Sequence, residues 1–274
     1  MDAYLQILFR DGILVWENCP PFVSLRQEGD DVYVEVSEDQ SVVGVVRYQT
    51  GGCIRWHVDV QKSARFSLIS IQQKQCSLDD TMVVQLQENA HASLHWMVAE
   101  LSTFTTKRQV DVFFHGPHSN FQLYGLHVMS EQASVETKTH LRHLAPYTTA
   151  TQQVKSVLFD RATSLFSGLV HVEPVAQKTD SNQYNHSLIL SDQARAISKP
   201  QLEIFADDVK CSHGATIGQL DRDEWFYLLT RGLSDCDAKS MLLTAYCQEI
   251  IDTIPIEDAR DRMMHTLLRK LATV

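Results

Sequence analysis

The sequence predicts a mainly β protein that ends in a small helical domain. Apolar residues alternate with polar ones over most of the chain as far as Asp221, which is the period of a half-buried strand. After Asp221 the apolar residues recur at helical spacing instead. A small residue also returns at roughly regular intervals, as it does in stacked repeats. We therefore predict a β core over residues 1–218 and a helical domain over residues 219–274.

The expected strands are short and numerous. Val32, Val34 and Val36 alternate with Tyr33 and Glu35, because successive side chains of a strand point to opposite faces. Similar runs follow in order at 42–48, 54–60, 66–71, 83–87, 110–115, 123–129, 154–159, 169–175, 186–190 and 202–206. About a dozen strands therefore precede the first convincing helix.

A weak internal repeat accompanies these strands. A polar or small residue followed by Ala recurs at 63–64, 89–90, 132–133, 161–162, 193–194 and 214–215. Each coil of a parallel β-helix stacks on its neighbours, and its tight corners favour small side chains. An antiparallel sandwich gives a comparable pattern, so the periodicity alone leaves both architectures open.

Three helices are expected after the strands. Asp221 followed by Glu224 is typical of a helix N-terminus, and the pair at 231–232, Arg then Gly, ends that helix. A second helix is predicted over 237–252, and a third begins near Pro255. This region could simply cap an open end of the repeat, which stacked folds require.

Composition narrows the function classes. The 274 residues carry a net charge of −10, which favours neither a nucleic-acid partner nor an anionic membrane surface. The first residues lack the basic and apolar segments of a signal peptide, and no run of 18 apolar residues follows. The six cysteines are scattered without a C-x-x-C, which suits reduced thiols in the cytosol. We expect a cytoplasmic protein whose cysteines are mostly small core residues.

Recognisable catalytic motifs are missing from the sequence. It contains no G-x-S-x-G elbow, Walker A loop, G-x-G-x-x-G, H-E-x-x-H or EF-hand loop, so we predict no enzyme and no catalytic residue. Three histidine pairs occur in strand-like sequence, where their spacing does not bring them together, and they are interpreted as strand surface: 91/95, 115/118 and 140/143. The Asp207–Asp208 pair is expected at a corner between coils, while the Trp225–Tyr227 run and the Met263–Met264 pair are expected to pack the helices.

Cys211 and His213 are the candidate metal ligands. Residues two apart on a strand share one face, so both side chains can turn toward the same ion. A thiolate and a neutral imidazole both bind iron, and imidazole leaves less negative charge on a cluster than a second thiolate would. A lone C-x-H is nevertheless a weak signal, and interface packing is an equal interpretation for Cys211.

The stretch around these two residues resembles the SufD subunits of the SUF iron–sulfur cluster assembly scaffold. The resemblance runs from about Lys138 onward and is looser over residues 1–137. SufD proteins usually open with a helical domain, whereas this chain enters strand-like sequence almost at Met1. The features that carry the resemblance are His143, Pro146, Gln153, Phe159–Asp160, Phe166 to Gly168, Ala176 to Asp180, Leu188 to Asp192, Lys199 to Glu203, Ala206 to Gln219, Phe226 to Leu228 and Arg231–Gly232.

The resemblance implies a right-handed parallel β-helix core and a non-catalytic scaffold function. It implies pairing with a SufB-type subunit through the β-helix edges, and docking of a SufC-type ATPase on the C-terminal helices. His213 matches the histidine by which SufD contributes to a nascent cluster or iron shared with SufB, and Cys211 lies near enough to assist. The SufB pattern has Glu after this histidine, and Gly214 stands there instead. No cofactor is expected to bind the isolated chain tightly, and its strand edge would also allow a homodimer.

Two other functions fit parts of the sequence. A β-helix lyase or hydrolase acting on acidic polysaccharide would need converging carboxylates, calcium or basic clamps, and such enzymes are usually secreted. A SufB-like partner carrying persulfide would need a reactive thiol at Cys53 or Cys76.

Overall fold

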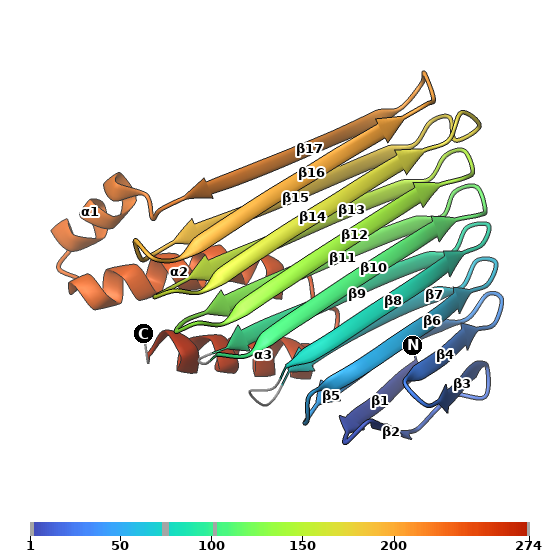
Figure 1. Ribbon diagram of the computed structural model, residues 1–274, viewed down its shortest axis with the longest axis horizontal. Coiled ribbons are helices and arrows are strands. Elements are labelled where there is room, and N and C mark those ends of the chain that lie inside the picture. The colour runs from blue at the N-terminus through green and yellow to red at the C-terminus, as the bar shows by residue number, and fades with distance from the viewer. Residues whose placement is uncertain (1–2, 73–76, 101–102, 273–274) are drawn as a thin grey trace.

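The computed structural model describes residues 3–72, 77–100 and 103–272, which contain seventeen strands and three helices (Figure 1). The strands come first and the helices last, as the change in period predicts. The strands are β1 (Ala3–Arg10), β2 (Ile13–Glu17), β3 (Val23–Glu28), β4 (Asp31–Val36), β5 (Ser41–Tyr48), β6 (Gly52–Val60), β7 (Arg65–Gln72), β8 (Leu78–Leu86), β9 (His91–Glu100), β10 (Thr105–Phe114), β11 (Asn120–Met129), β12 (Ser134–His143), β13 (Thr149–Leu158), β14 (Thr163–Val172), β15 (Asp180–Ile189), β16 (Arg195–Ile204) and β17 (Lys210–Gly218).

The chain alternates between two sheets. Sheet A has the order β17-β15-β13-β11-β9-β7-β5-β1-β2, and sheet B has the order β16-β14-β12-β10-β8-β6-β4-β3. Each strand from β6 to β17 pairs in parallel with the strand two places before it. This topology is a parallel β-helix, so that prediction is confirmed and the antiparallel sandwich is excluded.

The coil lengthens from its N-terminal to its C-terminal end. Near the start Ser41 is aligned with Arg65, whereas near the end Asp180 is aligned with the more distant Lys210. The expected corner residues Ala64, Ala90, Ala133, Ala162 and Ala194 do lie at corners and are buried. The sixth expected corner, 214–215, is wrong: these residues lie inside β17, because their pairing with Tyr184 and Asn185 of β15 continues the strand through them.

The interior of the coil changes character from its N-terminal to its C-terminal end. In β4 and β6 the inward side chains are apolar and buried, and Trp56 is 0% exposed. Burial of each such side chain contributes about 1.5–3 kcal/mol. In β15 four inward side chains are polar, and none of the four is more than 3% exposed: Ser181, Gln183, Asn185 and Ser187.

A buried ion pair lies between these two regions. Arg108 Nη1 donates to Asp80 Oδ2 at 2.9 Å, and Nη2 donates to Ser70 Oγ at 2.9 Å. The Tyr48 hydroxyl donates to the same carboxylate at 3.3 Å. Because a buried charge without a partner is strongly destabilising, these contacts fix the position of the pair inside the coil.

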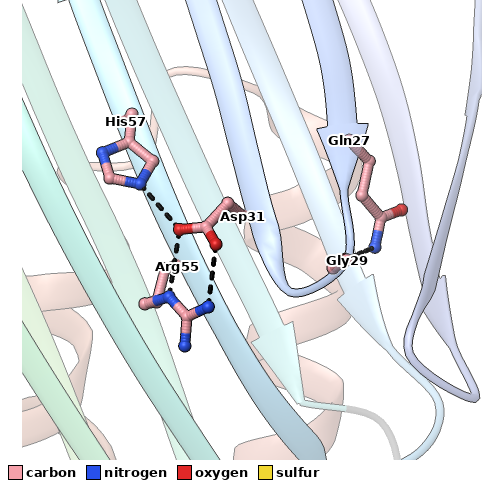
Figure 2. Close-up of polar contacts among 5 residues, drawn as sticks. All are labelled: Gln27, Gly29, Asp31, Arg55 and His57. Atoms are coloured by element: carbon pink, nitrogen blue, oxygen red, sulfur yellow. Dashed lines mark hydrogen bonds and ion pairs between the residues drawn. The ribbon is translucent and has the colours of Figure 1, made fainter.

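The N-terminal end of the coil is closed by two hairpins. β1 and β2 form an antiparallel pair in sheet A, and β3 and β4 form another in sheet B. Gln27 joins them, since its Nε2 donates to the carbonyls of Gly12 at 2.7 Å and Gly29 at 2.8 Å. Figure 2 shows the Gly29 contact beside an Asp31 clamp, which accepts from Arg55 Nη2 at 2.7 Å and contacts His57 Nε2 at 2.9 Å.

The three helices are α1 (Arg222–Thr230), α2 (Asp235–Ile251) and α3 (Glu257–Leu271). The Asp221 side chain accepts from the backbone N–H groups of Asp223 and Glu224 at the start of α1, as expected. Gly232 has φ +91°, a conformation that glycine adopts readily, and it ends the same helix. The expected helices are therefore present, although α2 starts two residues before the predicted 237.

Helices α2 and α3 cover the outer face of sheet A rather than the end of the coil. Leu243, Ile250, Met263 and Leu267 are buried against Val45, Ile69, Leu126 and other outward residues of the sheet, in one apolar cluster. Figure 1 shows both helices along this sheet, with α1 beyond the end of β17. The interpretation that these helices merely cap an open end of the coil is therefore wrong for α2 and α3.

Candidate metal site at the open end of the coil

Cys211 and His213 lie on the last strand, β17, and face the interior of the coil. The parallel register aligns Cys211 with Ser181 and His213 with Gln183. Aligned residues of adjacent strands share one face of the sheet. Ser181 and Gln183 are 0% exposed inside the coil, so Cys211 and His213 stand one coil above them, at its open mouth. The prediction that the two residues share a face is confirmed.

The two candidate ligands differ in their surroundings. His213 is exposed, whereas Cys211 is half-buried and packs against the main apolar core. Burial raises the pKa of the Cys211 thiol, and a backbone hydrogen bond from Ser181 acts in the opposite direction. The isolated thiol is therefore protonated near neutral pH, and a bound cation would have to displace its proton.

The strands around this mouth carry exposed apolar side chains. β16 and β17 are the last strands of their sheets, so each offers one backbone edge. Ile204, Phe205 and Ile217 are 39%, 60% and 49% exposed along these edges. An apolar rim beside two strand edges is the kind of surface to which another protein adds a strand.

A second exposed apolar surface lies on the helices. Phe226 and Tyr227 of α1 are 66% and 54% exposed, and Met241 of α2 is 53% exposed. The expectation that the Trp225–Tyr227 run packs the helices is wrong for Phe226 and Tyr227, because α1 stands off the coil and has no buried residue. Met263 of α3 is buried and Met264 is partly buried against the same apolar cluster, so the expectation that this pair packs the helices is confirmed.

A chain of polar contacts connects helix α2 with strand β17. Lys155 of β13 is 6% exposed and forms an ion pair with Glu249, and its Nζ donates to the carbonyl of Tyr246 at 3.1 Å. The Tyr246 hydroxyl donates to the carbonyl of His186 at 2.8 Å. His186 Nδ1 contacts Thr216 Oγ1 at 2.7 Å, three residues after His213.

The remaining candidate residues lie elsewhere. Asp207 and Asp208 form a corner between β16 and β17, as predicted. The histidine pairs do not form a site: within the described ranges no three His, Cys, Asp or Glu side chains come close enough to hold a metal ion. The interpretation as strand surface is wrong for His95 and His143, which are 3% and 0% exposed.

The alternative function as a persulfide carrier needs a reactive thiol at Cys53 or Cys76, and the surroundings of Cys53 do not supply one. Cys53 is exposed, and desolvation with the nearby Asp79 and Asp30 carboxylates raises its thiol pKa, the opposite of what a reactive thiol needs. Cys76 lies outside the described residues. Of the five described cysteines only Cys247 is buried, so the expectation that most of them are core residues is wrong.

A pocket of about 300 Å³ lies on the outer face of sheet B, between Arg26, Tyr33 and His57. It is at the opposite end of the coil from His213, so it takes no part in the candidate metal site. Among the described residues, no helix is both long and apolar enough to cross a membrane.

Sequence reasoning missed the polar residues beneath the candidate ligands. Ser181 and Gln183 lie in a run of Ser, Asn, Gln and Tyr that resembles a loop by composition. Their burial follows from the parallel register with β13 and β17. The signal that could have located them is their offset from Cys211 and His213, which is one coil length, the same offset that separates Asp180 from Lys210.

The sequence of this chain matches a known protein family. The family model described as "SUF system FeS cluster assembly, SufBD core domain" matches residues 27–246. The chain is 31% identical to the iron–sulfur cluster assembly protein SufD of Escherichia coli over 186 residues, which are 68% of this chain and 44% of that protein.

Two other relatives agree. A SufBD family protein of Synechocystis is 47% identical over 118 residues, or 43% of this chain and 26% of the relative. The chloroplastic protein ABCI7 of Arabidopsis thaliana is 27% identical over 206 residues, or 75% of this chain and 43% of the relative. The aligned regions thus cover less than half the length of each of these relatives.

Proposed function

Because this chain belongs to the SufBD family of SUF iron–sulfur cluster assembly proteins, we propose that it is a SufD-like scaffold subunit without catalytic activity of its own. In this proposal it pairs with a SufB-type subunit at the open end of its coil, and it binds a SufC-type ATPase through its helices. His213 is presented to iron or to a nascent cluster at the SufB interface.

The observation that carries the proposal is that the candidate metal ligands lie on the same strand that offers a free backbone edge. His213 and Cys211 face the mouth of the coil on the same strand that ends sheet A. Ile204, Phe205 and Ile217 surround the mouth with exposed apolar surface. A partner strand added to β16 or β17 would cover this surface and bring its own ligands to His213.

The proposed site is suited to transient binding. Iron in a cluster takes four ligands in all, and this chain offers one imidazole and one thiol at the mouth. The remaining ligands would come from the partner and from inorganic sulfide. A cluster shared in this way is cargo, held while the interface is formed and released when the partners separate. The unpaired thiols of the described residues suit a reducing compartment such as the cytosol.

The exposed aromatic surface of α1 is the proposed docking site for the ATPase. Phe226 and Tyr227 of α1 and Met241 of α2 supply the apolar contact area. The packing of α2 and α3 on sheet A holds this surface in place. ATP hydrolysis on the partner would favour one arrangement of the helices over another, since a partner shifts an equilibrium only by binding its states differently. The contacts through Tyr246, His186 and Thr216 connect these helices physically with β17.

The test is anaerobic co-purification with SufB-type and SufC-type subunits from the same cell, followed by iron and sulfide counting. We expect a three-component complex that loses iron and sulfide with His213→Ala. His118→Ala, at an exposed corner histidine outside β17, is the matched control and should retain both. A complex with unchanged iron would reduce His213 to a packing residue, and the absence of any association would rule out the scaffold function.

A further inference from the structure

The two residues directly beneath the candidate ligands are buried, and their polar side chains have no hydrogen-bond partner in the part of the chain that the structure describes. Ser181 lies under Cys211, and Gln183 lies under His213, each one strand spacing of about 4.8 Å away. Both are 0% exposed. Within the described residues, Ser181 Oγ and both amide atoms of Gln183 make no hydrogen bond. Buried polar groups are normally satisfied, so each of these calls for an explanation.

The opposite wall of the coil leaves room for the Gln183 amide. A Cβ atom placed on Gly168 would lie 1.9 Å from Gln183 Nε2 and 2.7 Å from its Cδ. The amide therefore spans the interior and fills the notch that Gly168 leaves in sheet B. An alanine at 168 could not coexist with this side-chain position, because the contact is far shorter than any real carbon–nitrogen contact. The register aligns Gly168 with Pro200 one coil above, so the notch lies below the same mouth.

The chemistry of the proposed cargo matches what these groups offer. When Cys211 binds iron, its thiol gives up a proton to solvent, and the resulting thiolate carries negative charge in a half-buried position. Inorganic sulfide is also anionic. Anionic sulfur ligands are stabilised by hydrogen-bond donors around them, and such donors also tune a bound cluster. A hydroxyl and an amide NH₂ are donors of this kind.

We propose that Ser181 and Gln183 are positioning residues that form a polar floor under the site and donate hydrogen bonds to the anionic sulfur ligands of the iron that His213 holds. This inference rests on the proposed function. It explains why the two residues below the ligands are polar, whereas the corresponding residues of β9, Ala92 and Leu94, are apolar and buried. In the register of the two strands Ser181 is aligned with Cys211 and Gln183 with His213.

The inference is tested on the complex of this chain with its SufB-type partner, with Co²⁺ as the probe for iron. Co²⁺ reports thiolate ligation through a charge-transfer absorption band. Gln183→Leu and Ser181→Ala each remove donors from the floor. Gln152→Leu is the matched control, because Gln152 lies one coil deeper in the same column, is equally buried and has an equally unpartnered amide. His213→Ala defines the fraction of Co²⁺ held at the site.

We expect Gln183→Leu and Ser181→Ala to weaken His213-dependent Co²⁺ binding by roughly 10- to 100-fold and to shift the charge-transfer band. Gln152→Leu should leave the affinity and the band unchanged. If both floor variants bind like the wild type while His213→Ala loses Co²⁺, the floor is structural and the inference is overturned alone. If His213→Ala itself binds as the wild type does, the proposed site and this inference both fail. Ser181→Ala removes a single oxygen, so it keeps the test decisive should Gln183→Leu fail to fold.

Discussion

At the N-terminal end of the coil both sheets finish in antiparallel hairpins, whereas at the C-terminal end they finish in single strands, β16 and β17. The polarity of the interior also differs between the two ends. Val32, Val34 and Val36 point into the first coil, whereas four polar side chains of β15 point into the last one. The N-terminal end therefore has the apolar, buried interior of an ordinary hydrophobic core. The C-terminal end combines polar interior, exposed apolar rim and candidate ligands, which is the composition expected of a surface that a partner completes.

The polar half should be the more sensitive to acid. Burial lowers the pKa of His95 to about 4 and of His127 and His143 to about 3. These histidines are neutral in the folded chain, so the unfolded state binds more protons as the pH falls below 6.5. Each should reduce the stability by roughly 2 kcal/mol between pH 7 and pH 5, because the unfolded histidine gains about 1.4 kcal/mol for each pH unit below its pKa.

Urea unfolding at pH 7 and pH 5 measures this loss, and hydrogen exchange locates it. We expect β9 and β11–β13 to exchange faster at pH 5 and β4 and β6 to change little. The comparison of the two halves breaks down if the loss of protection is uniform along the coil or if stability is the same at both pH values.

Trp56→Ala should produce the next largest effect. Trp56 is 0% exposed in the apolar half, and truncating such a side chain typically destabilises by about 3–5 kcal/mol through lost burial and the cavity left behind. Leu202→Ala, at a partly buried position in β16, is the control and should lower stability by only about 1 kcal/mol. Equal losses in urea unfolding would mean that the open end is as well packed as the closed one.

Lys155→Met tests the attachment of α2 to sheet A. The Tyr246 carbonyl keeps its partner within the helix but loses the bond from the charged Lys155 amine, and a hydrogen bond to a charged group contributes about 1.5–3 kcal/mol. Glu249, 60% exposed at its side chain, would return to water. Hydrogen exchange should rise in α2 and at β17 while the first coils stay protected. The control is Lys239→Met, which removes an exposed pair with Asp235 and should change neither measurement.

Much of this architecture follows from sequence. Strands such as β4 and β6 alternate cleanly, and the Ala corners reveal the repeat, although periodicity alone does not separate a coil from a sandwich. Strand β12 was not predicted, because Thr137, Thr139 and His143 occupy inward positions at which a strand normally has apolar residues. The face shared by Cys211 and His213 was predictable from spacing. The floor under them was not, because Ser181 and Gln183 acquire their meaning only from their alignment with a strand one full coil later in the chain.

The smallest expected effect on stability belongs to the variants that test the central claim. Ile13 in β2 and Ile217 in β17 are 60% and 49% exposed, and they stand on the two terminal strands of the same sheet. Ile13→Asp and Ile217→Asp should each change the unfolding free energy by less than about 0.5 kcal/mol, because surface substitutions are usually mild.

The most direct measurement is the affinity of each variant for the SufB-type subunit, determined by titration of the purified partners. A charge placed in an apolar interface core is strongly unfavourable, so Ile217→Asp should weaken binding at least 100-fold while Ile13→Asp binds like the wild type. Equal affinities for both variants, or a loss confined to Ile13→Asp, would contradict the claim that the open C-terminal end of the coil is the docking edge.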